Sequence, residues 1–259
     1  MTNRKFGEKN VLHIRIFILS LLFAVMSVGT GCASKGNTTK NPDPFEPINR
    51  GIYKFNDVAD TYVLRPVAKG YQKITPDPVE QGISNAFDTW TYPVTIVNDF
   101  LQGKFKQGVS DTGRFVVNLT IGLLGLFDPA TPLGLEYHQE DFGQTFAKWG
   151  IPSGPYIVVP LFGPRTIRSG IGTLADVQVN PVTLWRNTSM RDKTLILWAI
   201  ETRAGLIGPD EIIDDAFDPY LFIRDAYLQN REFMINDGKE LDDDSDFEDD
   251  FDDGFDDDF

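Results

Sequence analysis

Apolar side chains recur at helical spacing along most of the chain. Residues three and four positions apart share one face of an α-helix. Three such sets are Ile48 to Tyr62, Val79 to Trp90 and Val94 to Phe105. Residues 194–200 extend the pattern, and Asp218 before Pro219 is typical of a helix start, with a capping carboxylate followed by proline at the first position. The pattern predicts a mostly α-helical domain.

One apolar run departs from this pattern. Tyr156 to Phe162 is preceded by Pro155, contains Pro160, and is followed by Gly163 and Pro164. Proline lacks the amide hydrogen that a helix needs and clashes with the preceding turn, so the run is predicted to be extended. A small β-hairpin or extended element therefore accompanies the helices. Its apolar side chains fit either a well-packed buried loop or a surface shaped for lipid.

A second apolar run, residues 115–127, carries polar and glycine residues inside it. Its thirteen residues are too few to cross about 30 Å of hydrocarbon as a helix. Gly122 and Gly125 weaken a helix and permit a tight bend. A core helix, a hairpin with a strand, and a re-entrant element beside a lipid path all remain open, since irregular backbone at membrane depth is tolerated where it lines a cavity.

The N-terminus has the order of a secretory signal: basic residues, the uncharged stretch Ile16 to Val28, then small residues. The stretch is short for a transmembrane helix, which leaves a permanent membrane anchor as the weaker alternative. Cys32 follows it and is the only cysteine, so no intramolecular disulfide can form. This position predicts lipid attachment at Cys32, although Gly29 stands where such sites usually have leucine. Ordinary cleavage with a free thiol is the alternative, and Ala33 favours the outer membrane.

The C-terminus is strongly acidic. Residues 240–259 contain thirteen acidic and no basic residues, which accounts for nearly all of the net charge of −14. Like charges repel, so a disordered, solvated tail is predicted. Phenylalanines recur there every four residues, from Phe247 to Phe259, which also fits a docking peptide for a basic partner or loose cation binding. A net-negative chain without a basic patch is not expected to bind nucleic acid.

These features divide the chain into four parts. The predicted parts are a signal peptide (1–31), a lipidated tether (32–44), one helical domain (45–238) and the acidic tail (239–259).

The domain shows no catalytic pattern. His138 is the only histidine after the signal, and no Gly-x-Ser-x-Gly elbow supplies a nucleophile for it. One cysteine and one histidine are too few for a zinc site, and no phosphate-binding glycine-rich loop is present. The sequence predicts no enzyme activity, no metal and no cofactor.

Ordered blocks spread over residues 43–238 resemble one known family. The blocks include Asp43 to Arg50, Asn98 to Gly103, Phe142 to Thr145, Glu201 to Ala204 and Asp218 to Tyr227. Together they resemble the MlaA (VacJ) lipoproteins. The acidic tail and Gly29 depart from that family's pattern, so a function for the tail does not follow from the resemblance.

The resemblance implies a ring-like helical domain embedded in the outer membrane, with an amphipathic channel. It implies that phospholipids leave the outer leaflet through this channel, pass to a periplasmic lipid-binding protein similar to MlaC, and that trimeric porins hold the ring. By match to the family's channel segment, the expected channel element runs from Asn118 to Leu126. Gly122 and Gly125 would permit its bend, Asn118 and Thr120 would hydrogen-bond a headgroup, and the acyl chains would contact Leu119, Leu123, Leu124 and Leu126.

Two other functions remain open. One is a scaffolding lipoprotein that bridges porins to another envelope component without moving lipid, with the acidic tail as its hook. The other is a periplasmic hydrolase that uses His138.

Overall fold

A computed structural model describes residues 43–238 of the chain. The predicted mostly α-helical fold with a small β element is confirmed. Within the described range, none of the helices combines the length and the apolarity needed to cross a bilayer. The elements are α2 (Glu46–Ala59), the π-helix η1 (Asp60–Leu64), α3 (Arg65–Ile74), α4 (Asp77–Thr91), α5 (Pro93–Leu101), α6 (Phe105–Thr120), the 3₁₀ turn η2 (Thr131–Leu133), α7 (Phe142–Lys148), β1 (Tyr156–Val159), β2 (Gly163–Thr166), α8 (Ile167–Val179), α9 (Thr188–Gly205), α10 (Asp210–Asp214) and α11 (Pro219–Ile235).

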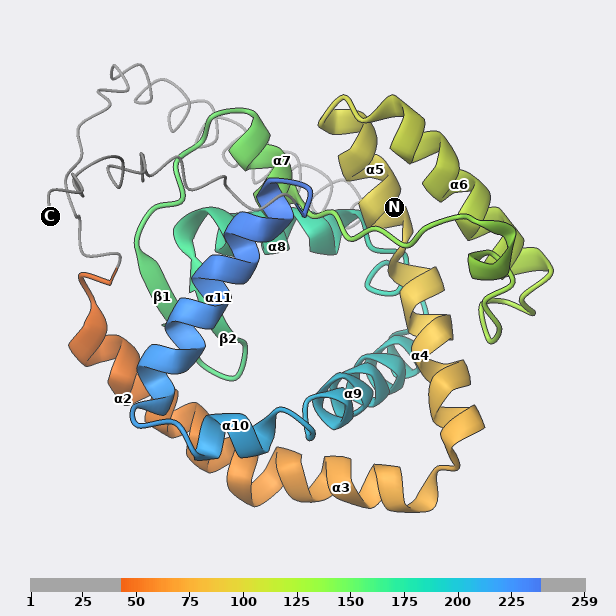
Figure 1. Cartoon of the computed structure of the whole chain (residues 1–259). Helices are drawn as coiled ribbons and strands as arrows, with labels where there is room; N and C mark the ends of the chain where they lie inside the picture. The colour runs from red at the N-terminus through yellow and green to blue at the C-terminus, as the bar shows by residue number, and fades with distance from the viewer. Residues whose placement is uncertain (1–42, 239–259) are drawn as a thin grey trace, which may run out of the picture. The chain divides into compact units, whose positions relative to one another are not determined.

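Within residues 43–238 the elements contact one another in a closed circuit. Starting from α2, the contacts run through η1 to α3, then to α9, α4, α5, α7 and α8, and return through β2 and β1 to α2. Figure 1 shows α2, α3, α4 and α5 following one another around this circuit, with α11 beside the hairpin of β1 and β2. These contacts support the ring-like arrangement that the resemblance implies for this part of the chain.

The β element is an antiparallel hairpin. Tyr156 pairs with Thr166 and Val159 pairs with Gly163. Leu161 and Gly163 in the connection have φ values of 64° and 75°, in the left-handed region that a tight turn requires. The extended structure predicted for the Pro-rich run is confirmed. β1 buries Tyr156 and Val158 against Tyr220 of α11, and this cluster forms an apolar core.

Three details differ from the predicted elements. The single helix predicted from Val94 to Phe105 is two helices, because α5 ends at Leu101 and Gly103 turns the chain with a φ of 80°. The strand considered within residues 115–127 is wrong, since residues 115–120 are helical and the rest form turns. Helices α3, α7, α8 and α10 were not predicted. In α8 the apolar residues follow a Pro-rich segment without a clear polar face, and Thr166 begins the helix through a capping box with Ser169.

Beside the apolar core, many polar side chains are buried and many large apolar side chains are exposed. The fully buried side chains include Asn49, Asn98, Asp99 and Asp111. By contrast, the apolar stripe predicted for α2 and η1 is largely exposed, and Tyr62 keeps 76% of its surface. Large apolar side chains are exposed on nearly every helix in this range. Exposed apolar surface on this scale indicates contact with a partner or a membrane.

The signal peptide, Cys32, most of the tether and the acidic tail lie outside the described residues. The domain boundaries, the lipid attachment at Cys32 and the nature of the tail therefore stay predictions.

Candidate functional site

The expected channel element is the end of α6 and the loop that follows it. Asn118, Leu119 and Thr120 form the last turn of the helix, and residues 121–127 form a compact series of turns. Leu123, Leu124 and Gly125 are consecutive residues with positive φ values of 52°, 60° and 93°. Such a run is unfavourable for leucine, so neighbouring contacts must hold the loop in this form.

Backbone hydrogen bonds tie the loop to the end of α6. The N–H of Leu124 donates to the carbonyl of Leu119 at 3.0 Å, and the N–H of Gly125 donates to that of Asn118 at 2.9 Å. The N–H of Phe127 closes the loop on the carbonyl of Gly122 at 2.9 Å. A Cβ atom at Gly122 would lie 2.4 Å from the carbonyl oxygens of Asn118 and Phe127, so only glycine fits there.

Helix α4 holds the other side of the loop. The indole Nε1 of Trp90 donates to the carbonyl of Leu124 at 2.9 Å. A Cβ atom at Gly125 would lie 2.6 Å from Cβ of Thr89, which shows how closely the loop approaches the helix. The two predicted bend positions, Gly122 and Gly125, are thus the points of closest backbone approach.

The loop presents its apolar side chains outward. Leu119 is half-buried, whereas most of the following apolar residues are exposed. The exposed side chains are Ile121 (67%), Leu123 (61%), Leu124 (64%), Leu126 (46%) and Phe127 (60%). A loop that hydrogen-bonds internally and exposes leucine and phenylalanine is suited to contact acyl chains.

The two polar residues of the segment, buried Asn118 and exposed Thr120, both hydrogen-bond to other groups of the protein. The Asn118 side chain is buried; its Nδ2 donates to Asp128 at 3.0 Å and its Oδ1 accepts from the N–H of Ala130 at 3.1 Å. The hydroxyl of Thr120 donates to the carbonyl of Val116 at 2.6 Å. A contact with a lipid headgroup, which was predicted for both, would have to compete with these bonds.

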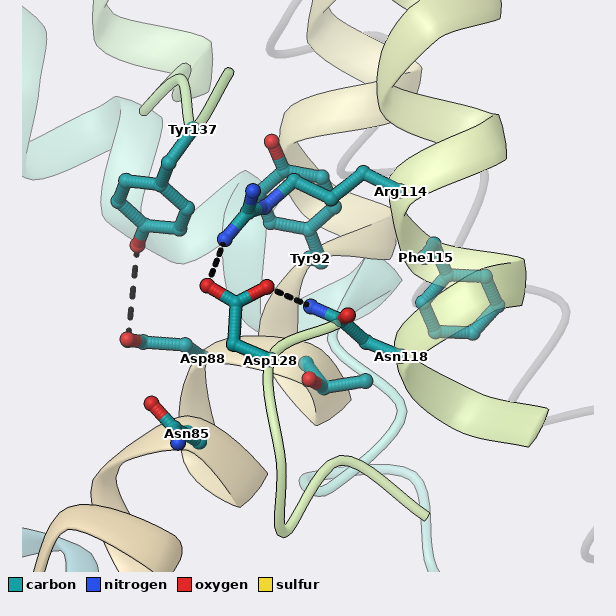
Figure 2. A pocket seen from close by; sticks show the side chains of 9 residues that line it. Asn85, Asp88, Tyr92, Arg114, Phe115, Asn118, Asp128 and Tyr137 are labelled. Atoms are coloured by element: carbon teal, nitrogen blue, oxygen red, sulfur yellow. Dashed lines mark hydrogen bonds and ion pairs between the residues drawn. The ribbon is translucent and has the colours of Figure 1, made fainter. Parts of the chain in front are cut away.

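A polar pocket lies beneath the loop, between α4 and α6 (Figure 2). Its volume of about 20 Å³ holds about one water molecule, far less than a lipid headgroup. Figure 2 shows the carboxylate of Asp128 between the Arg114 guanidinium, at 2.6 Å, and the Asn118 amide. The lining residues are Asn85, Asp88, Thr89, Tyr92, Arg114, Phe115, Asn118, Asp128 and Tyr137.

The pKa values of the ionisable groups that line this pocket are shifted in opposite directions. Burial alone would raise the pKa of Asp128, but hydrogen bonds from Thr131, Asn118 and Arg114 lower it. Burial raises the pKa of Asp88, with the charge of Glu201 adding to the effect, and burial next to Asp88 raises the pKa of Tyr137 to about 12. Asp128 is thus held as an anion by its donors.

Among residues 43–238, no group of three or more His, Cys, Asp or Glu side chains is arranged to hold a metal ion. The Nδ1 atom of His138 lies 2.9 Å from Asp111, so this histidine contacts an interior carboxylate. The loop presents an apolar outer face, and the charged, hydrogen-bonded residues of the pocket support it from beneath.

The sequence pattern did not single out the residues that line the pocket. Asp88 and Tyr92 lie one turn apart at the end of α4, Tyr137 comes from a distant loop, and only the fold brings them to Arg114. The available signal was the position of Arg114 and Asp128 at the two ends of an apolar run, where the 2.6 Å ion pair now joins them.

Comparison with known proteins identifies one family. The family model for the MlaA lipoprotein matches residues 41–234. The intermembrane phospholipid transport system lipoprotein MlaA of Escherichia coli (strain K12) is 35% identical over 230 residues, which cover 85% of this chain and 91% of that protein. The protein of the same name from Haemophilus influenzae is 33% identical, with 86% and 91% covered.

A solved chain from work on the structural basis for maintenance of bacterial outer membrane lipid asymmetry is also similar. It is 34% identical, superposes with a TM-score of 0.67, and the match covers 75% of this chain and 99% of that one. The family match and these identities over most of both chains show that this protein belongs to the MlaA lipoprotein family.

Proposed function

We propose that this protein is an outer-membrane lipoprotein that removes misplaced phospholipids from the outer leaflet and so maintains the lipid asymmetry of the outer membrane. Its relatives are named for intermembrane phospholipid transport, and the similar solved chain concerns outer membrane lipid asymmetry. Family membership over residues 41–234 supports the same role for this chain.

The observation that carries the proposal is the loop at residues 121–127. It exposes five large apolar side chains and rests on the ion pair between Arg114 and Asp128. A phospholipid crosses a leaflet slowly because its charged headgroup must enter hydrocarbon, where an unpaired charge is costly. A path with a polar wall for the headgroup and apolar side chains for the tails lowers that cost. No bond is broken, so the step needs no nucleophile.

The exposed apolar helices support a position within the membrane. Helices α2 and α3 and the π-helix between them expose Phe55, Tyr62 and Val67, among others. These helices are too short or too polar to span a bilayer, and the exposed residues suit burial in one leaflet. Acyl chains on Cys32, outside the described residues, would hold the protein at the membrane.

Two partners belong to the proposal. A periplasmic lipid-binding protein similar to MlaC would accept the phospholipid and carry it toward the inner membrane. Trimeric porins would hold the domain in place. A scaffold that bridges porins without moving lipid is the competing function, because exposed apolar surface also suits protein contacts.

Purified components separate the two functions. The acylated protein is reconstituted with porin in vesicles that carry a labelled phospholipid, and transfer to the periplasmic carrier is followed over time. A transporter accelerates transfer, whereas a scaffold leaves the rate at that of porin vesicles without it. The second result would reject the proposed function.

A substitution in the loop links transport to the proposed surface. Asparagine tolerates positive φ better than leucine does, so Leu123→Asn combined with Leu124→Asn keeps the loop backbone while removing apolar surface. We expect normal abundance and a loss of lipid transfer. Leu133→Asn is the control, because Leu133 is 65% exposed but lies outside the loop. Equal rates of lipid transfer by the loop variant and the control would show that the apolar surface of the loop is not needed for transport.

A reversible crosslink tests whether the loop must move. A Cβ atom at Gly82 in α4 would lie 3.4 Å from the carbonyl oxygen of Leu126, so Gly82→Cys and Leu126→Cys place two thiols at this contact. Oxidation should stop lipid transfer and reduction should restore it. Each single variant, oxidised in the same way, is the control. Transfer that continues in the fully oxidised pair would show that the loop stays in place during transport.

A further inference from the structure

Two carboxyl groups that do not line the pocket lie fully buried between α5 and α6. The side chains of Asp99 in α5 and Asp111 in α6 have no exposed surface. The helices approach closely there, because a Cβ atom at Gly108 would lie 3.2 Å from Cβ of Asp99. Burying an ionised carboxylate is costly unless donors or an opposite charge compensate it.

Each carboxyl group has donors on one oxygen only. Oδ1 of Asp99 accepts from Nε2 of Gln107 at 2.8 Å. Oδ1 of Asp111 accepts from the hydroxyl of Tyr92 at 3.0 Å and lies 2.9 Å from Nδ1 of His138. No donor among residues 43–238 reaches Oδ2 of either side chain.

Apart from His138, which contacts Asp111, the charged groups beside this pair bind one another. Glu140, also buried, faces Asp99 and binds Nε2 of Gln107 at 3.1 Å. Lys104, on the loop between α5 and α6, pairs with Glu140 at 2.6 Å and with Asp237, at the end of α11. One lysine therefore serves two other carboxylates, and none of its ion pairs is to Asp99 or Asp111.

Two carboxylates in contact in a buried site do not both ionise near neutral pH, since like charges repel and burial disfavours each. Burial, a hydrogen bond with Asp111 and the charges of Asp111 and Glu140 raise the pKa of Asp99 well above its usual range. A hydrogen bond between two carboxyl groups exists only when one of them carries a proton. The geometry thus fits an acid–carboxylate pair joined through the two otherwise unbonded oxygens.

We propose that Asp99 and Asp111 share one proton that fastens α5 to α6, and that loss of this proton at alkaline pH loosens the contact. Both carboxyl groups of the pair are then negatively charged, in a site that already holds Glu140. Because α6 leads directly into residues 121–127, the loosened helix also frees the base of that loop. The contact between α5 and α6 is thus sensitive to pH.

The sign of the pH effect follows from the raised pKa of Asp99. The folded state binds this proton more tightly than the unfolded chain, whose aspartate has a pKa near 3.8. The stabilisation is therefore complete below that value and is lost as the pH rises through the folded-state pKa. Stability should fall on the alkaline side, opposite to the behaviour of an ion-paired aspartate.

Hydrogen–deuterium exchange of the acylated, detergent-solubilised protein tests this. Between about pH 5 and about pH 9, after correction for base catalysis, amides of α5 and α6 should lose at least about ten-fold protection. In Asp99→Asn the amide can donate to Asp111 at every pH, so this loss should disappear. Glu136→Gln is the matched control, since Glu136 lies close to His138 but its side chain is 87% exposed. An equal loss in the wild-type protein and Asp99→Asn would overturn the proposal.

Infrared spectroscopy gives a second reading that does not depend on the variant's folding. Wild-type protein near neutral pH should show the stretching band of a protonated carboxyl group, and titration to alkaline pH should remove it as the exchange protection falls. A wild-type spectrum without that band near neutral pH would also overturn the proposal. If Asp99→Asn fails to fold, Asp111→Asn takes its place in the exchange experiment.

Discussion

The side chain of Asn49 in α2 completes the hydrogen bonding of β1 by accepting from the N–H of Val158 at 2.9 Å. Its Nδ2 also donates to the carbonyl of Tyr156 at 3.1 Å, so one amide satisfies a donor and an acceptor on the open edge of the hairpin. Asn56, two turns further along α2, does the same for Val159 and Leu161. A two-stranded hairpin is marginal alone, and the two asparagines make α2 a substitute for its third strand.

Asn49→Ala should destabilise the domain by about 3 kcal/mol, because it leaves several buried polar groups without a partner. Asn49 is 2% exposed and also donates to Asp43 at 2.7 Å. Asn56→Ala should cost about 1 kcal/mol, since its hydrogen bonds are partly exposed to water. Urea unfolding in detergent compares the two. Equal costs would contradict this account of the hairpin edge.

The sequence predicted helices where apolar spacing and capping agree. Asp218 caps α11 by accepting from the N–H of Leu221 at 3.2 Å, as its position before Pro219 indicated. The spacing could not tell which face is buried. In α2 the buried position is Asn49, while Ile48 is 63% exposed. Apolar periodicity identifies one face of a helix, but in α2 this apolar face is the exposed one and the polar Asn49 is buried.

Gly125→Ala should disturb the loop that the proposed function depends on. The alanine would have to keep a φ of 93°, and its Cβ atom would lie 2.6 Å from Cβ of Thr89, an atom fixed to the α4 backbone. The left-handed backbone alone costs about 1 kcal/mol or more, and the clash adds to it. Thermal unfolding and the amount of phospholipid in the outer leaflet measure the two consequences.

Gly134→Ala is the matched control for this experiment. Gly134 has a φ of 80°, but a Cβ atom there would meet no other atom within 4 Å. It should therefore show the backbone cost without the clash and keep lipid asymmetry normal. If both alanine variants behaved alike, close contact between the loop and α4 would have no role.

The pocket beneath the loop shows where sequence reasoning stopped. Gly122 and Gly125 could be singled out because glycine marks a bend, and both lie at close contacts. The engagement of Asn118 with Asp128 could not be seen, because it depends on how the chain returns to α6 after the loop. Local pattern predicts where a chain bends, whereas contacts between returning segments are set by the whole fold.

Asp128→Asn should remove an acid-sensitive part of the stability. Donors from Thr131, Asn118 and Arg114 outweigh the effect of burial and lower the pKa of Asp128 below its ordinary value of 3.8. The stabilisation is therefore present above about pH 4 and is lost as the pH falls through the folded-state pKa. The difference in free energy of unfolding between wild type and variant should shrink on acidification. A constant difference between wild type and Asp128→Asn across this pH range would contradict the prediction.

Arg203→Ala should open the contact between η1, α9 and α10. The Arg203 guanidinium binds both oxygens of Asp60, at 2.6 and 2.7 Å, and both of Asp210, at 3.0 and 2.9 Å. Its side chain is 12% exposed, so its removal leaves two partly buried carboxylates with only the longer contacts of Arg65, at 3.4 Å to each. Breaking such a pair costs about 3 kcal/mol. Urea unfolding measures the loss.

Arg203→Lys separates charge from geometry. Lysine restores the positive charge but cannot present the planar fork that two carboxylates need, so it should recover only part of the lost stability. Arg191→Ala is the control, because Arg191 pairs only with its neighbour Asp192, whose side chain is 59% exposed. Full recovery by lysine would mean that net charge alone matters at this junction. Partial recovery would identify the fork of Arg203 as the group that joins the π-helix to α9 and α10.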